Sequence, residues 1–107
     1  MKELDTLAQI YSKSSFRELK NLIDGANLVL HWGKIIDEPI ASQTEALKFY
    51  KGIIYVETAS SVWANELTYL KKELIEKLNR RFDKPVVKDI KFLVKGVKYG
   101  KGRKKSG

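Results

Sequence analysis

The residues of this 107-residue chain with the clearest chemistry are its lysines and arginines, which gather in the last third of the sequence. Residues 71–107 hold fourteen Lys/Arg and four Asp/Glu, a net charge of +10, whereas residues 1–70 hold seven and nine, a net charge of −2. Such asymmetry is typical of proteins that bind a polyanion, since cationic side chains neutralise phosphates. Solubility and attraction to a membrane surface are the other interpretations of a terminal charge run.

The basic side chains expected to contact nucleic acid lie on the long helix, on the last strand and in the tail. They are Lys71, Lys72, Arg80, Arg81, Lys88, Lys91, Lys95, Lys98, Lys101, Arg103, Lys104 and Lys105. Two tyrosines, Tyr50 and Tyr55, lie beside lysines in segments that alternate like strands. Their rings could stack on bases, as aromatic side chains do in proteins that bind single strands. The alternative is that tyrosine is simply a good strand residue.

Residues suited to catalysis or metal binding are scarce. The chain has no cysteine and one histidine, His31, so thiol chemistry and multi-histidine metal centres are excluded. The acids lie mostly beside basic neighbours on expected helices, as in Glu73 and Lys77, which is typical of a solvated helix face. Phosphate-binding glycine loops are also missing from the sequence. We therefore expect a protein that is not an enzyme and needs no cofactor or metal.

The first half of the chain is expected to be helical. Apolar residues from Leu4 to Tyr11 recur at helical spacing, and Ser15 with Glu18 forms a capping box for a second helix that ends at Asp24-Gly25. Asn27 could cap a third helix, which must end before Pro39. The first two helices could instead be one helix bent near Ser14-Ser15.

The second half alternates strands with a helix. Leu47 and Phe49 on one face, then Ile54, Val56 and Thr58, predict a β-hairpin that turns at Lys51-Gly52. A long helix over about residues 61–81 follows, capped by Ser60 or Ser61, with an apolar stripe of Trp63, Leu67, Leu70, Leu74 and Leu78. Asp83-Lys84-Pro85 ends it, and a last strand places Ile90, Phe92 and Val94 on one face.

This order predicts an α+β domain, a three-stranded sheet covered on one face by helices. One domain fills residues 1–95, and residues 96–107 form a basic tail expected to be disordered. The opposite face of the sheet would show Lys48, Tyr50, Tyr55, Glu57, Lys91, Leu93 and Lys95. No apolar stretch is long enough to span a membrane and no secretory signal is evident, so we expect a cytoplasmic, nucleoid-associated protein.

The segment from Trp32 to Phe92 resembles the bacterial DciA-type domain. The residues that carry the resemblance are Trp32, Ile35-Ile36, Ile40–Thr44, Leu78-Asn79, Val87, Ile90, Phe92 and, above all, Gly52-x-Ile54-x-Val56-x-Thr58-x-Ser60-Ser61-x-Trp63-Ala64-x-Glu66-Leu67. The chain departs from the family at Asp37, where a glycine is expected, and near Glu45-Ala46, where a proline is common.

The resemblance implies a KH-like fold and a role with the replicative DNA helicase DnaB, as a loader or operator. A KH domain grips the nucleic-acid backbone through a G-x-x-G loop, which this sequence lacks, so binding would depend on lysines and stacking. The resemblance thus favours a replication accessory protein that binds single-stranded or forked DNA and DnaB. A KH-like module for RNA is the alternative. Trp63 is either a core residue or an anchor for the protein partner.

Overall fold

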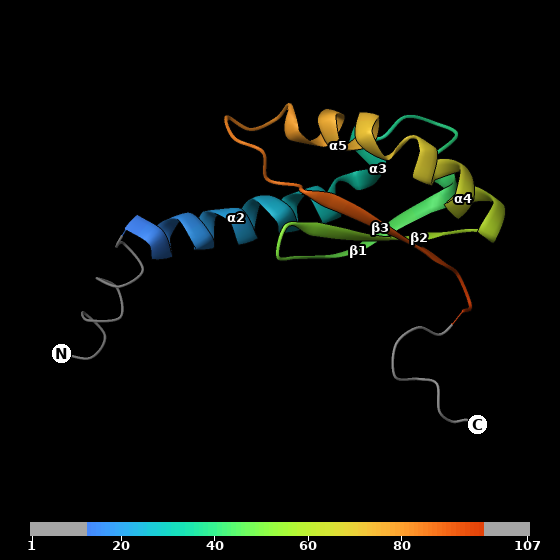
Figure 1. Ribbon diagram of the computed structural model, residues 1–107, viewed down its shortest axis with the longest axis horizontal. Coiled ribbons are helices and arrows are strands. Elements are labelled where there is room, and N and C mark those ends of the chain that lie inside the picture. Colours follow the sequence, from blue (N-terminus) through green and yellow to red (C-terminus); the bar gives the residue numbers. More distant parts are fainter. Residues whose placement is uncertain (1–12, 98–107) are drawn as a thin grey trace, which may run out of the picture.

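The computed structural model describes residues 13–97 and shows one three-stranded sheet with helices packed on it (Figure 1). The elements in chain order are α2 (Lys13–Leu30), α3 (Trp32–Ile35), a 3-10 turn η1 (Ala41–Gln43), β1 (Thr44–Tyr50), β2 (Ile53–Thr58), α4 (Ser61–Tyr69), α5 (Lys71–Asn79) and β3 (Asp89–Val94). The predicted α+β class and the order of strands and helices are confirmed. The expected first helix and most of the basic tail lie outside the described residues.

The sheet has the order β1-β2-β3, with β1 antiparallel to β2 and β2 parallel to β3. The turn between β1 and β2 places Lys51 at φ 50° and Gly52 at φ 83°, as the predicted tight hairpin requires. A parallel third strand needs a crossover, which α4 and α5 supply on one side of the sheet (Figure 1).

The prediction that Leu47 faces the helices is wrong. The register between β1 and β2 shifts between Ala46 and Lys48, so β1 carries one extra residue there. Ala46 and Phe49 therefore both pack toward the core, and the side chain of Leu47 is 44% exposed. A bulge of this kind moves every later side chain to the other face, which simple alternation does not anticipate.

The prediction that Gly25 ends a helix is also wrong, because α2 continues unbroken from Lys13 to Leu30 through Ser15 and Gly25. A Cβ atom at Gly25 would overlap the ring of Phe49 on β1. Glycine is therefore needed at this position for close approach of the helix to the strand rather than for a left-handed turn. Asn27, expected to cap a third helix, lies inside α2 for the same reason.

The chain turns after α2 around a buried tryptophan. Trp32 is almost fully buried, and its indole N–H donates to Thr44 Oγ1 at 2.8 Å. The Thr44 hydroxyl donates in turn to the carbonyl of Ile40 at 2.7 Å. The Lys77 ammonium lies 2.8 Å from a carboxylate oxygen of Asp37, so the residue that departs from the expected glycine ties this connection to α5.

The long helix predicted over about residues 61–81 is two helices. Ser60 caps α4 as expected, accepting a hydrogen bond from Trp63 N. Leu70 leaves the helical region at φ −99°, ψ 5°, and the Thr68 hydroxyl bonds back to the carbonyl of Ala64 at 2.8 Å. Such back-bonding by Thr competes with the helix and bends it. Leu70 is consequently exposed, whereas Leu67, Leu74 and Leu78 stay buried.

The return from α5 to β3 is held by one side chain. Asn79 Oδ1 accepts hydrogen bonds from the backbone N–H groups of Val86 and Val87 at 2.9 and 2.8 Å, and Asn79 Nδ2 donates to the carbonyl of Val87.

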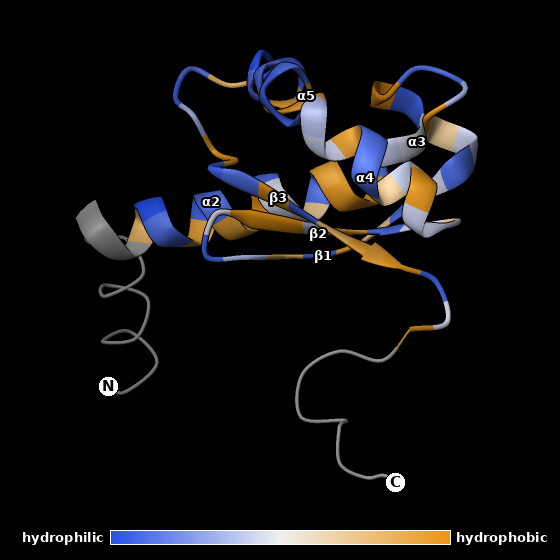
Figure 2. Ribbon diagram, turned by 45° about the vertical axis from the view of Figure 1, so that its right-hand side comes forward, coloured by the Kyte–Doolittle hydropathy of each residue, from blue (hydrophilic) through white to orange (hydrophobic). Residues whose placement is uncertain are grey.

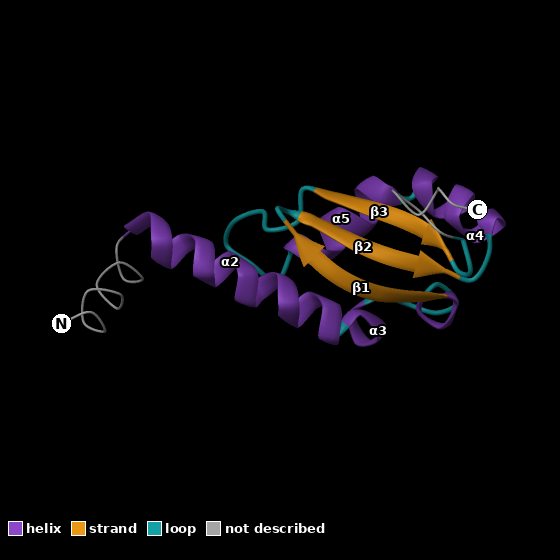
Figure 3. Ribbon diagram, turned by 90° about the horizontal axis from the view of Figure 1, so that it is seen from below, coloured by secondary structure: helices purple, strands orange, loops and turns teal. Residues whose placement is uncertain are grey.

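The core lies between the helices and one face of the sheet. Figure 2 shows hydrophobic residues along β3 and hydrophilic residues on the outer turns of α5. In the described part of the chain, no helix covers the other face of the sheet (Figure 3).

Candidate nucleic-acid interface

The open face of the sheet carries a row of a lysine, a tyrosine and a lysine across the three strands. Cα pairing matches Lys48 of β1 with Tyr55 of β2, and Tyr55 with Lys91 of β3. Paired residues project on the same side of a sheet, so the central ring has a basic residue in each neighbouring strand. The Lys48 ammonium lies 4.9 Å from the centroid of the Tyr55 ring.

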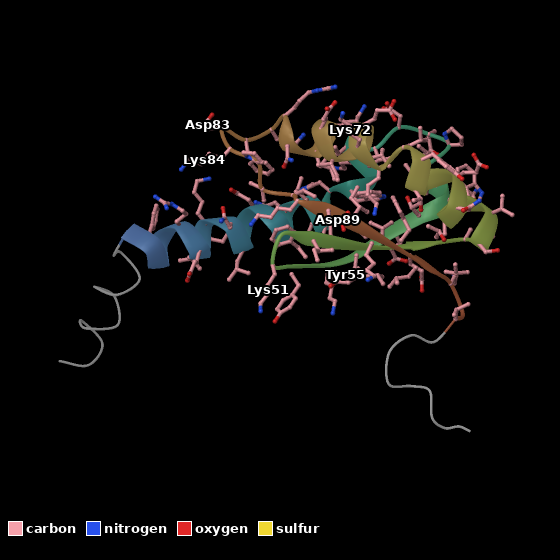
Figure 4. The ribbon with its side chains drawn as sticks, viewed as in Figure 1. Lys51, Tyr55, Lys72, Asp83, Lys84 and Asp89 are labelled. Atoms are coloured by element: carbon pink, nitrogen blue, oxygen red, sulfur yellow. The ribbon has the colours of Figure 1, made fainter. Side chains whose placement is uncertain are left out.

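A second aromatic and basic pair lies at the end of the hairpin. The Lys51 ammonium is 5.4 Å from the centroid of the Tyr50 ring, and the Tyr50 side chain is exposed. In Figure 4, Lys51 and Tyr55 point away from the side of the sheet that α4 and α5 cover. We call this surface the hairpin platform; its residues are Lys48, Tyr50, Lys51, Tyr55 and Lys91.

The far end of the same face is acidic. Glu45 pairs with Glu57, and Glu57 with Leu93. Lys95, expected among the contacts with nucleic acid, lines a small hollow of about 130 Å³ together with these two glutamates. The open face is thus polarised, with cationic and aromatic groups near the turn and carboxylates at the opposite end. Phosphates are attracted to the first region and repelled by the second.

The structure does not bring all the predicted basic residues onto the platform. Lys71 and Lys72 begin α5 and, with Lys88, line a cavity between α5 and the start of β3. The Lys71 ammonium forms an ion pair with Asp89 at 3.2 Å. Figure 4 places Lys72 on the helical side, away from Lys51 and Tyr55.

The two predicted arginines, Arg80 and Arg81, lie on neither the platform nor the cavity beside β3. Arg80 and Arg81 follow the end of α5, where Arg81 lines a hollow with Asn27, Leu28, His31 and Phe82. Lys98, Lys101, Arg103, Lys104 and Lys105 lie outside the described residues. The residues of this cluster are therefore distributed around the described part of the chain, because the crossover from α5 to β3 carries them around the domain. Lys71 and Lys91 still line one hollow at the edge of β3.

Sequence reasoning did not include two platform residues, Lys48 and Lys51, among its binding candidates. The signal was present, since each lysine is within two residues of Tyr50 in a segment that reads as a hairpin. Net charge does not single out these two lysines, because the first 70 residues are slightly acidic overall.

Trp63 lies in the first turn of α4 and is half-buried. Its side chain packs against the core of the domain. This contact accounts for a structural role, while the exposed remainder leaves room for contact with a partner.

The described residues offer little for catalysis. His31 is exposed, and its Nδ1 lies 2.9 Å from the carbonyl oxygen of Asn27. Residues 13–97 contain no group of three or more His, Asp or Glu side chains placed to hold a metal ion. Of the helices in that range, none is long and apolar enough to cross a membrane.

Comparison with known proteins gives two findings. The sequence profile of the family described as "Dna[CI] antecedent, DciA" matches residues 4–92. A curated UPF0232 protein of Bifidobacterium longum is 32% identical over 66 residues, which cover 62% of this chain and 42% of that protein. The match therefore spans less than half the length of this relative.

Proposed function

The chain belongs to the DciA family, and from that membership and the hairpin platform we propose a replication accessory protein that binds single-stranded or forked DNA and the replicative helicase DnaB. The family description, an antecedent of DnaC and DnaI, indicates a role related to replication. In our proposal the protein acts by binding, in the cytoplasm at the nucleoid, and catalyses no reaction.

The observation that carries DNA binding is the row formed by Lys48, Tyr55 and Lys91. Proteins that bind single strands without sequence preference combine aromatic rings, on which bases stack, with cationic groups that follow the backbone. The row supplies both on a face that no helix of residues 13–97 covers (Figure 3). A base on the Tyr55 ring would take the position now next to the Lys48 ammonium, which could then move to a flanking phosphate.

The first experiment measures binding of a fluorescent oligothymidylate by anisotropy at low salt for wild type, Tyr55→Ala and Tyr55→Phe. One base–aromatic stack contributes about 1–3 kcal/mol, so Tyr55→Ala should weaken binding about 5- to 150-fold, since tenfold corresponds to about 1.4 kcal/mol. Tyr55→Phe keeps the ring and should bind like wild type.

The matched charge variants are Lys91→Gln, on the platform, and Lys34→Gln, on α3. Lys91→Gln should weaken binding, whereas Lys34→Gln should not. If folded Tyr55→Ala and Lys91→Gln proteins both bind DNA as wild type does, the platform is not the DNA site. Competition with an RNA oligonucleotide of matched sequence tests the alternative of an RNA-binding module.

Contact with the helicase is tested by capture of purified DnaB on the immobilised protein. Wild type is compared with Trp63→Ala and with a chain that lacks residues 96–107. Loss of capture by a folded Trp63→Ala protein would assign that ring to the interface. Normal capture would leave Trp63 with its role in the core alone.

A further inference from the structure

A cavity of about 460 Å³ lies where α4 meets α5, beside the start of β3. It shares three of its lining residues with a second hollow of about 440 Å³, which continues along β3 beneath α4. Together they form a groove on the helical side of the free edge of the sheet. We call the first part the junction groove; the lining residues used below are Tyr69, Lys71, Lys72, Ile75 and Lys88.

Tyr69 is the notable residue of this groove, because 77% of its surface is exposed. In residues 13–97 its ring has no cation and no second ring packed on it, unlike the rings of Tyr50 and Tyr55. It is the last residue of α4, immediately before the break at Leu70. The described fold therefore makes no structural use of this ring, which is available to a ligand.

The charges around the ring favour an anion. Three lysines line the junction groove, with Glu76 and Asp89 as its acids. The Asp89 carboxylate is paired with the Lys71 ammonium at 3.2 Å. Lys72 and Lys88 are exposed and form no ion pair within the described residues. Two unpaired ammonium groups near an exposed ring suit a phosphate next to a base.

Lys88 also connects the groove to the hairpin. Its side-chain carbons lie 3.0–3.4 Å from the point where a Cβ atom of Gly52 would be, so its stem packs over the hairpin turn. Its backbone N–H donates to the carbonyl of Gly52 at 2.7 Å. The aliphatic part of the Lys88 side chain is thus fixed between the hairpin platform and the junction groove. Its ammonium can bind a phosphate of a nucleic-acid strand that passes from one surface to the other.

We infer that the junction groove is a second site for single-stranded nucleic acid, in which one base stacks on Tyr69 and the adjoining phosphates bind Lys72 and Lys88. The inference rests on the proposed DNA binding and adds to it a site on the other side of β3 from the hairpin platform. A strand held at both sites would bend around the start of β3. Ile75, which also lines the groove and packs against the core, would give the base an apolar contact.

The test measures the affinity for a labelled oligothymidylate of about 20 nucleotides, longer than one such site needs, for wild type, Tyr69→Ala, Tyr69→Phe and Lys72→Gln. Tyr69→Ala should weaken binding about 5-fold or more, the lower limit for the loss of one stack. Tyr69→Phe should bind like wild type, and Lys72→Gln should weaken binding. The control is Leu30→Ala, since Leu30 is also 77% exposed but lies at the end of α2. This change should leave the affinity for the oligonucleotide as in wild type.

The Tyr55→Ala variant separates this inference from the proposed function. If Tyr55→Ala weakens binding and a folded Tyr69→Ala protein binds as wild type does, the platform stands and the second site is overturned. If neither change weakens binding, both are overturned. If Tyr69→Ala leaves DNA affinity unchanged but abolishes capture of DnaB, the groove binds protein, which also overturns the inference. When Tyr55 and Tyr69 are both replaced, separate sites should give losses that multiply.

Discussion

Replacement of Gly25 by alanine should destabilise the domain, although the same change in an ordinary helix stabilises it. Alanine is favoured over glycine inside a helix by about 1 kcal/mol. At this position, however, the new methyl group would overlap Cγ, Cδ2 and Cε2 of the Phe49 ring. The overlap involves the base of the ring and not the end of a flexible chain, so the ring or the helix must move. Overpacking of this kind costs about 1–3 kcal/mol.

We therefore expect Gly25→Ala to lower the free energy of unfolding by up to about 2 kcal/mol after the gain in helix propensity is subtracted. Urea unfolding followed by tryptophan fluorescence measures it, since Trp32 is buried. Gly33→Ala is the control, because a Cβ there would have nothing within 4 Å; it should be neutral or stabilising. In a Phe49→Ala background the Gly25 change should also stabilise. A Gly25→Ala protein more stable than wild type would refute the proposed contact.

Three further outcomes are expected. Asn79→Ala removes three hydrogen bonds to Val86 and Val87, and because it leaves their N–H groups unpaired it should cost about 2–4 kcal/mol in urea unfolding; a cost below that would show that water replaces the amide. Asp37→Asn breaks the pair with Lys77, but since the Asp37 side chain is 81% exposed the same measurement should change by less than about 1 kcal/mol. If the three lysines of the platform and the two unpaired lysines of the junction groove neutralise phosphates, log Kd for single strands should change with log salt by about 3.5, and a flat dependence would contradict binding through phosphates.

The strands and their faces could be predicted from the sequence because each depends on residues close together in the chain. Alternation of apolar and polar residues identified β2 and β3, and Gly52 identified the turn between β1 and β2. The open face followed from the same alternation, so Tyr55 and Lys91 were correctly placed on one surface. Only the bulge at Leu47 was not predicted, because an extra residue in one strand can be recognised only when the pairing with the neighbouring strand is known.

The helix boundaries could not be predicted in the same way because they depend on contacts distant in sequence. Gly25 looks like a helix terminus until Phe49, 24 residues later, is seen against it. The break at Leu70 cannot be seen in the sequence, because the apolar spacing of a helix continues across it and Leu67 and Leu74 are both buried. The end of α4 at Tyr69, and with it the junction groove, was therefore not foreseen from the sequence.

The polarity of the open face limits how a strand of DNA could cross it. Glu45 and Glu57 occupy the end of the face away from the turn, so a backbone that ran along the strands would bring phosphates beside carboxylates. A path across the strands avoids them, because Lys48, Tyr55 and Lys91 lie in one row from β1 to β3. Such a path leaves the sheet at β3, whose first residues lie beside Lys88 and the junction groove. The direction that electrostatics favours on the platform therefore leads to the second proposed site.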